Sequence, residues 1–212
     1  MDADAIEIRV LGSLIEKQRT TPDAYPLSLN ALRLACNQTT NRDPVVEYDE
    51  PTIRAAIGRL SRKEWVRLAS GAGRRAVKHR HLLDQALGVS AAELSLLAVL
   101  MLRGPQTPGE LKQRSERLYP FGSLENVEET LAGLIDRNLV AQLPRQPGQK
   151  EERYAQLLGE SATAAAETMP SAPAQRHDED RIGALEARVG RLERELEALR
   201  PALRSAHPTE GR

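Results

Sequence analysis

The sequence predicts a mostly helical α+β protein with two similar units and a separate C-terminal helix. Residues 50–80 read as an amphipathic helix followed by a β-hairpin, and residues 123–157 repeat that order. Residues 182–203 place hydrophobic side chains at alternating spacings of three and four, which is a heptad pattern. A helix followed by a hairpin is typical of a winged helix. The predicted fold class is therefore two tandem winged-helix domains, a flexible linker and a C-terminal coiled-coil helix.

Changes in pattern and composition divide the chain into four segments. The linker is rich in Ala, Ser, Thr, Pro and Glu and has no periodic apolar residues, as is typical of flexible segments. Units of about 75 residues have marginal cores, so the two units are candidates to pack together. The segments are winged-helix domain 1 (1–88), winged-helix domain 2 (89–158), the flexible linker (159–180) and the coiled-coil helix (181–204).

Overall composition indicates a cytoplasmic protein with no membrane partner. No apolar run approaches the roughly 20 residues that span a bilayer, and the acidic N-terminus does not resemble a secretory signal. The single cysteine, Cys36, excludes an internal disulfide and is expected to be a small core residue. Aromatic residues make up only 3% of the chain, which argues against a base-stacking platform for single strands or RNA.

In the first unit, residues 5–18 have the apolar spacing of a helix, and Ser28 is a candidate N-cap for a second helix that reaches Cys36. Residues 37–49 are a polar loop, in which Val45 and Val46 are expected to form a short strand. Pro51 suits the first turn of the third helix.

In the second unit, Ser90 and Glu93 have the spacing of a capping box, as do Thr107 and Glu110. The first of these helices is expected to end at Gly104 and the second to run through Leu118. Residues 82–89 read as a connector between the units. A third helix from Ser123 and two strands, at 139–143 and 151–157, complete the repeat.

Positive charge is concentrated in the first helix–hairpin stretch. Between Arg54 and Arg80 there are nine basic residues and one acidic residue, whereas the whole chain carries no formal net charge. Such a local excess is typical of a surface that binds a polyanion. The alternative is an ordinary solvated helix face and hairpin.

Helical geometry places this charge on a face that can contact DNA. Pro51, Ala55, Gly58 and Arg62 lie opposite the apolar stripe, so small residues would let the helix approach a DNA groove. Asn41 and Arg42 of the preceding loop are additional candidates for a phosphate contact, the alternative being that these side chains satisfy their own loop. The residues predicted to contact double-stranded DNA are Arg54, Arg59, Arg62, Lys63, Arg74, Arg75, Lys78, Arg42 and Asn41.

The second unit differs in charge at the equivalent face. Glu125, Glu129, Ala132 and Asp136 lie opposite its apolar stripe, and carboxylates there would repel a phosphate backbone. Domain 2 is therefore better suited to a protein partner or to packing.

The heptad pattern predicts a parallel homodimer, because Ile and Val occupy the first two a positions and Leu every d position. A single amphipathic helix that folds back on the body is the alternative. The residues predicted to form the dimer seam are Ile182, Leu185, Val189, Leu192, Leu196 and Leu199.

Enzymatic function is not predicted, and neither is a cofactor or a metal. The chain has no phosphate-binding glycine loop, no H-E-x-x-H and no paired CxxC motif. His79 and His81 share one face of a predicted strand, but two ligands are too few for a typical zinc site, so both are expected to belong to the basic hairpin.

Four stretches of the chain resemble the YceH-like bacterial proteins. This resemblance implies tandem winged-helix domains and a bacterial cytoplasmic protein, and it draws attention to the loop from Cys36 to Pro44. It carries over no catalytic or ligand residues. The stretches are EKQRTTPDAYPLS (16–28), ACNQTTNRDPV (35–45), LRGPQTPGEL (102–111) and PGQKEERY (147–154).

Two functions follow as expectations. The first is a DNA-binding, transcription-regulator-like protein that uses the basic helix and hairpin of domain 1 and dimerises through its C-terminal helix. The second is a non-enzymatic winged-helix scaffold for protein interactions, since fold alone does not determine function.

Overall fold

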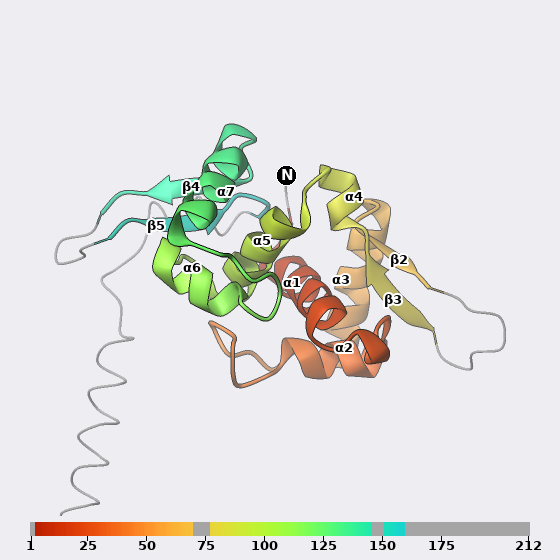
Figure 1. Cartoon of the computed structure of the whole chain (residues 1–212). Helices are drawn as coiled ribbons and strands as arrows, with labels where there is room; N and C mark the ends of the chain where they lie inside the picture. The colour runs from red at the N-terminus through yellow and green to blue at the C-terminus, as the bar shows by residue number, and fades with distance from the viewer. Residues whose placement is uncertain (1–2, 70–76, 146–150, 160–212) are drawn as a thin grey trace, which may run out of the picture. The chain divides into compact units, whose positions relative to one another are not determined.

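The computed structural model describes residues 3–69, 77–145 and 151–159 (Figure 1). Seven α-helices and two small antiparallel sheets lie in these ranges, which confirms a mostly helical α+β protein. None of these helices combines the length and apolar composition that a bilayer-spanning segment requires.

The first part of the chain forms three α-helices and a three-stranded sheet. The strand order is β1-β3-β2, and both pairings are antiparallel. The elements are α1 (Ala5–Thr20), the 3-10 turn η1 (Pro22–Ala24), β1 (Leu27–Ser28), α2 (Leu29–Cys36), α3 (Glu50–Arg62), β2 (Val66–Leu68) and β3 (Lys78–His81).

The second part repeats the order of three helices followed by two antiparallel strands. Gln106 exchanges two backbone hydrogen bonds with Tyr154, in the position that corresponds to β1 of the first part. The elements are α5 (Ala91–Arg103), α6 (Pro108–Ser115), α7 (Leu124–Asp136), β4 (Val140–Leu143) and β5 (Arg153–Gln156), and α4 (Leu83–Leu87) precedes them.

Local side-chain chemistry explains where the helices begin. The predicted capping boxes at Ser90 and Thr107 are both formed, with each N-cap hydroxyl accepting from the backbone N–H three residues later. The sequence reading missed a third capping box, in which Asp4 and Glu7 start α1. These caps satisfy backbone donors that the first helical turn leaves without partners.

Two local predictions need correction. Val45 and Val46 form no strand, and the third strand of the sheet, beside β3, is instead β1. With only two residues, β1 is too short to show a periodic pattern in the sequence. The expected connector at 82–89 contains α4, which buries Leu83 and ends at Gly88 in the left-handed conformation (φ 60°).

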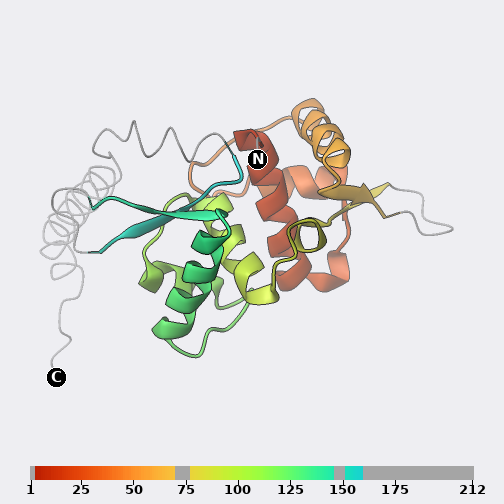
Figure 2. The same ribbon diagram turned by 90° about the horizontal axis from the view of Figure 1, so that it is seen from above.

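One hydrophobic cluster contains buried side chains from both parts of the chain. Its centre is the contact between α1 and α5, the most extensive between any two described elements, and Figures 1 and 2 show these helices side by side. Gly12 makes the approach possible, because a Cβ there would lie 2.9 Å from Leu102 Cγ and 3.0 Å from Met101 Cβ. Any larger residue would force the two helices apart.

We expect Gly12→Ala to lower the free energy of unfolding by ~1–3 kcal/mol, because the added methyl group overpacks the α1–α5 contact. Gly133→Ala in α7 is the matched control, since a Cβ there meets nothing within 4 Å and alanine favours helix by ~0.5–1 kcal/mol. Urea denaturation of both full-length variants gives the two values. Equal stabilisation by both substitutions would show that the helices do not meet at Gly12.

Candidate nucleic-acid interface

The helix α3 is built as the sequence predicts. Asp49 caps its start by accepting from the Thr52 backbone N–H at 2.8 Å, and Pro51 occupies the first turn. Its buried face consists of Ile53, Ala56, Ile57 and Leu60. The opposite face is thereby directed away from the core.

Small side chains leave that outward face open. Pro51 and Ala55 are exposed, and a Cβ added at Gly58 would meet no atom nearer than Arg62 Nη1, at 4.0 Å. Arg54 and Arg62 are both exposed on the same face. The helix can therefore approach a flat or grooved surface closely, with a guanidinium group near each end.

An exposed ion pair holds Arg54 only weakly. Its Nη2 lies 2.7 Å from Glu50 Oε1, and the two side chains are 70% and 48% exposed. Pairs this exposed contribute ~0–1 kcal/mol and are screened by salt, so a phosphate can compete for Arg54.

Arg59 and Lys63 are already engaged by carboxylates at the start of α1. Arg59 Nη2 lies 2.6 Å from Asp4 Oδ2, and Lys63 Nζ lies 3.0 Å from Glu7 Oε2. Glu7 is buried, with a side chain that is 2% exposed. These contacts fasten α3 to α1, and they remove Arg59 and Lys63 from the group of cations that face outward.

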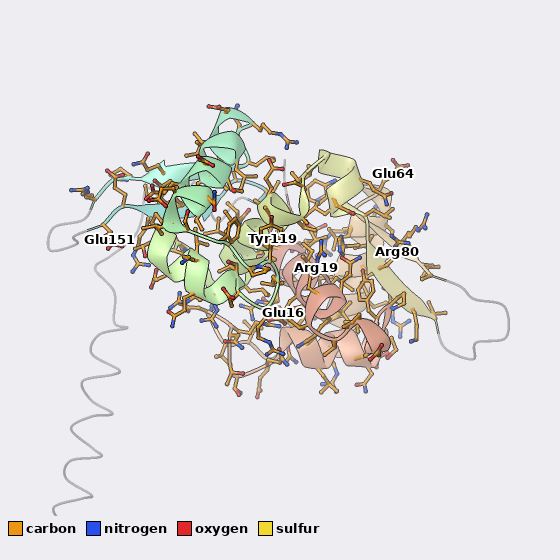
Figure 3. All side chains as sticks on the ribbon, in the orientation of Figure 1. Glu16, Arg19, Glu64, Arg80, Tyr119 and Glu151 are labelled. Carbon is orange, nitrogen blue, oxygen red and sulfur yellow. The ribbon has the colours of Figure 1, made fainter. Side chains whose placement is uncertain are left out.

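The sheet adds a cationic pair that the sequence reading did not single out. Arg67 and Arg80 are cross-strand partners on the face opposite the buried side chains of His79 and His81. Figure 3 marks Arg80 on this sheet. Like charges in directly opposed positions destabilise a sheet, and a bound anion would relieve that repulsion. The alternation of Val66 and Arg67 in the sequence indicates that Arg67 faces outward. The sequence does not show the register of the two strands, which places Arg67 opposite Arg80.

His79 and His81 lie in β3 of the hairpin, as expected, but their side chains are directed toward the core. Both are buried, because odd-numbered residues of β3 face the core. His81 Nε2 lies 2.6 Å from Gln18 Oε1, and its backbone N–H donates to Tyr25 Oη at 2.9 Å. Burial lowers the pKa of His81 to about 4, so the ring is neutral at pH 7. Within the described residues, no group of three or more side chains is arranged to hold a metal ion.

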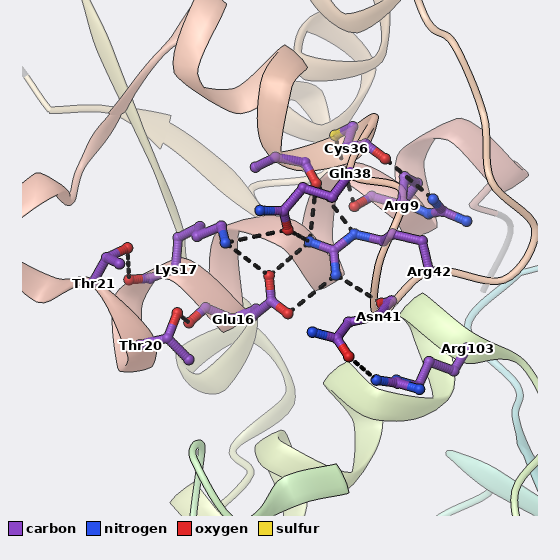
Figure 4. Close-up of polar contacts among 11 residues, drawn as sticks. Arg9, Glu16, Lys17, Thr20, Thr21, Cys36, Gln38, Asn41, Arg42 and Arg103 are labelled. Carbon is purple, nitrogen blue, oxygen red and sulfur yellow. Dashed lines mark hydrogen bonds and ion pairs between the residues drawn. The ribbon is translucent and has the colours of Figure 1, made fainter. Parts of the chain in front are cut away.

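Arg42 lies inside the protein and away from the outward face of α3 (Figure 4). Its guanidinium donates to Glu16 Oε2 at 2.6 Å and to the Ala35 carbonyl at 2.9 Å. The side chain of Asn41 accepts from Arg103 of α5. The suggested phosphate contacts of Asn41 and Arg42 are therefore not part of this interface, because one side chain is buried and the other is directed toward α5.

Two buried arginines instead fix the loop that leads into α3. Arg9 donates to the carbonyls of Cys36, at 3.1 Å, and Pro44, at 2.6 Å, while Arg42 binds the carbonyl of Ala35. Cations at the C-terminal carbonyls of α2 donate to acceptors that have no partner within the helix. They also interact favourably with the negative end of the helix dipole. The arginines thus hold the loop at its start and at Pro44, and the side chain of Asn37 pairs with the backbone of Tyr48 just before α3.

The equivalent face of α7 is acidic and open. Glu125, Glu129, Ala132 and Asp136 are all exposed. The outward faces of α3 and α7 therefore carry opposite charges, although the helices occupy corresponding places in the two parts of the chain.

Some predicted contacts lie outside the described residues. Arg74 and Arg75 are in the undescribed stretch 70–76. The predicted dimer seam lies beyond residue 159, and its residues are Ile182, Leu185, Val189, Leu192, Leu196 and Leu199.

Comparison with known proteins confirms the resemblance to an uncharacterised bacterial family. The family described as "Protein of unknown function, DUF480" matches residues 3–149. A UPF0502 protein from Shewanella amazonensis is 45% identical over 202 residues, covering 92% of this chain and 96% of its own. UPF0502 proteins from Geotalea daltonii (50% identical; 90% and 86% covered) and Solibacter usitatus (47% identical; 93% and 96% covered) are similar over almost the same length.

We expect Arg42→Met to reduce the free energy of unfolding by ~3–5 kcal/mol, because it leaves Glu16 largely buried without its main partner. Arg54→Met is the matched control. Its ion pair has nearly the same length, 2.7 Å against 2.6 Å, but is exposed, so the expected change is within ~0.5 kcal/mol. Denaturant titrations of the two variants would contradict this account if their losses were equal.

We expect acid to destabilise the protein through His81. Because its folded pKa of about 4 lies below the ordinary value of 6.5, only the unfolded chain binds a proton between these values. The contribution is complete above about pH 6.5 and falls by up to ~3 kcal/mol as the pH drops to about 4. Urea titrations across this range should show a shallower pH slope for His81→Gln than for the parent. Unchanged slopes would contradict burial of the neutral ring.

Proposed function

The chain belongs to the bacterial DUF480 family, and from the surface of this member we propose that it binds double-stranded DNA. The contact is made by the outward face of α3 and the neighbouring strands β2 and β3. In this proposal each part of the chain is a winged helix, and α3 is the helix that enters the major groove. The resulting role is regulator-like, with no catalytic step.

The observation that carries the proposal is the open, small-residue face of α3 with Arg54 and Arg62 exposed along it. Arginine suits this role because its planar group contacts phosphates or guanine edges bidentately. The opposed Arg67 and Arg80 extend the positive charge onto the sheet, in the place where a wing would lie.

The set of proposed contacts differs from the one that the sequence alone suggests. Arg59, Lys63 and Arg42 are engaged by carboxylates, so their contributions are to the fold. Arg74 and Arg75 remain proposed contacts on sequence grounds. The contacts now proposed from described residues are Arg54, Arg62, Arg67, Lys78 and Arg80.

Dimerisation through the heptad seam is also part of the proposal and rests on the sequence. A two-fold symmetric pair would present two copies of α3 to two half-sites, which is how many helix-turn-helix proteins gain affinity. Removal of residues 181–212 should then weaken DNA binding and reduce the mass in solution from that of a dimer to that of a monomer.

A protein-interaction scaffold is the second candidate, favoured by the exposed carboxylates of α7. Such a surface fits a basic partner. Loss of a stoichiometric partner on Glu129→Lys plus Asp136→Lys, with duplex binding absent in the parent, would favour this role over the first.

For the DNA proposal, we expect full-length protein to bind a duplex with a steep salt dependence. Neutralising about five phosphates predicts a fall in affinity of several hundredfold between 50 and 200 mM salt. Arg54→Glu plus Arg62→Glu should abolish binding, whereas Lys112→Glu plus Arg117→Glu on and beyond α6 carries the same charge change as a control. Fluorescence anisotropy measures both. Binding that ignores salt, or that falls equally in the two variants, would refute the proposal.

A further inference from the structure

A pocket lies where the loop before α3 meets α1, α5 and the end of α6. Its volume is about 360 Å³, which suits a small organic molecule. Apolar walls come from Val99, Leu102 and Leu118, and the polar lining includes Asn41. It is separate from the proposed DNA surface, since no residue of α3, β2 or β3 lines it.

Three arginines line this pocket: Arg103 from α5, Arg114 from α6, and Arg117, which follows α6. Two carboxylates lie at the pocket, and both already have cationic partners: Glu16 is part of the lining, and Glu110 contacts Arg114. Glu16 is held by Arg42, at 2.6 Å. Glu110 lies 3.4 Å from Arg114 but only 2.9 Å from Arg153, so it is shared between two cations. Positive charge in the pocket therefore exceeds the negative charge available to balance it.

Arg103 is the cation most clearly in need of a counter-ion. Its guanidinium donates to the amide oxygen of Asn41 (Figure 4). By contrast, the buried Arg42 and the partly exposed Arg59 each pair with a carboxylate. The pKa of Arg103 is lowered, chiefly by burial and then by the charges of Arg114 and Arg42, and the carboxylates of Glu16 and Glu110 offset this only in part. A bound anion would remove this repulsion and supply charge-assisted hydrogen bonds.

Asn41 is placed to take part in the same contact. It adopts the left-handed conformation (φ 60°), which asparagine tolerates better than most residues, and its side chain reaches Arg103 across the pocket edge. Its amide group provides donors next to the guanidinium group. An arginine flanked by an amide, with apolar walls behind, matches a ligand with a charged head and a short carbon skeleton.

We propose that this pocket binds a small organic dianion, with Arg103, Arg114 and Arg117 holding its charged group. A phosphate monoester and a di- or tricarboxylate share this chemistry, and planar guanidinium groups bind both bidentately. The carbon skeleton lies against Leu102 and Leu118. The site does not depend on DNA binding, and neither proposal requires the other.

The test is calorimetric titration of the full-length protein at low chloride with three probes: inorganic phosphate, ribose 5-phosphate and citrate. We expect at least one probe to saturate with a Kd of about 1 mM or tighter. Arg103→Gln should weaken it at least about tenfold, the loss expected for one charge-assisted contact. Saturation by the two phosphates alone identifies a phosphate ligand, and saturation by citrate alone identifies a carboxylate ligand.

Controls separate this site from general attraction of anions. Arg19→Gln on α1 removes the same charge from an exposed side chain outside both the pocket and the proposed DNA surface, and it should leave the Kd unchanged. Arg117→Gln is the second pocket variant, because its exposed side chain can be replaced with little risk to folding. Absence of saturation by all three probes, or an equal loss in Arg19→Gln and both pocket variants, would overturn the proposal.

Discussion

The close approach of α1 and α5 at Gly12 is the constraint on which the rest of the described structure depends. A glycine at this crossing lets side chains from both parts of the chain share one hydrophobic cluster. Units of about 75 residues bury little surface alone, so a shared core provides stability that neither part would have by itself. The two parts of the chain are thus joined by direct packing of α1 against α5, in addition to the connector that contains α4.

The other surfaces of α1 organise the proposed interface. Asp4 and Glu7 at its start hold Arg59 and Lys63 of α3, and Arg9 holds the loop that precedes α3. The same carboxylates that fix the helix therefore neutralise part of its charge. What remains exposed on α3 is a narrower cationic face than the composition of the segment suggests.

The sequence predicted most helices and the two hairpins, β2–β3 and β4–β5, because periodic apolar residues and capping residues are local signals. It did not predict which arginines face outward. Arg54 and Arg42 are chemically identical in the sequence, and only tertiary structure places one in solvent and the other beside Glu16. The opposition of Arg67 and Arg80 likewise depends on strand register, and the pocket around Arg103 joins segments more than 60 residues apart.

Cys36 provides an internal reporter of local opening. It is fully buried where α2 meets α1, and burial raises the pKa of its thiol to about 11. A thiol in that state does not react with alkylating reagents, since the thiolate is the nucleophile. Because the chain has a single cysteine, the rate of its alkylation would measure how often α2 separates locally from α1.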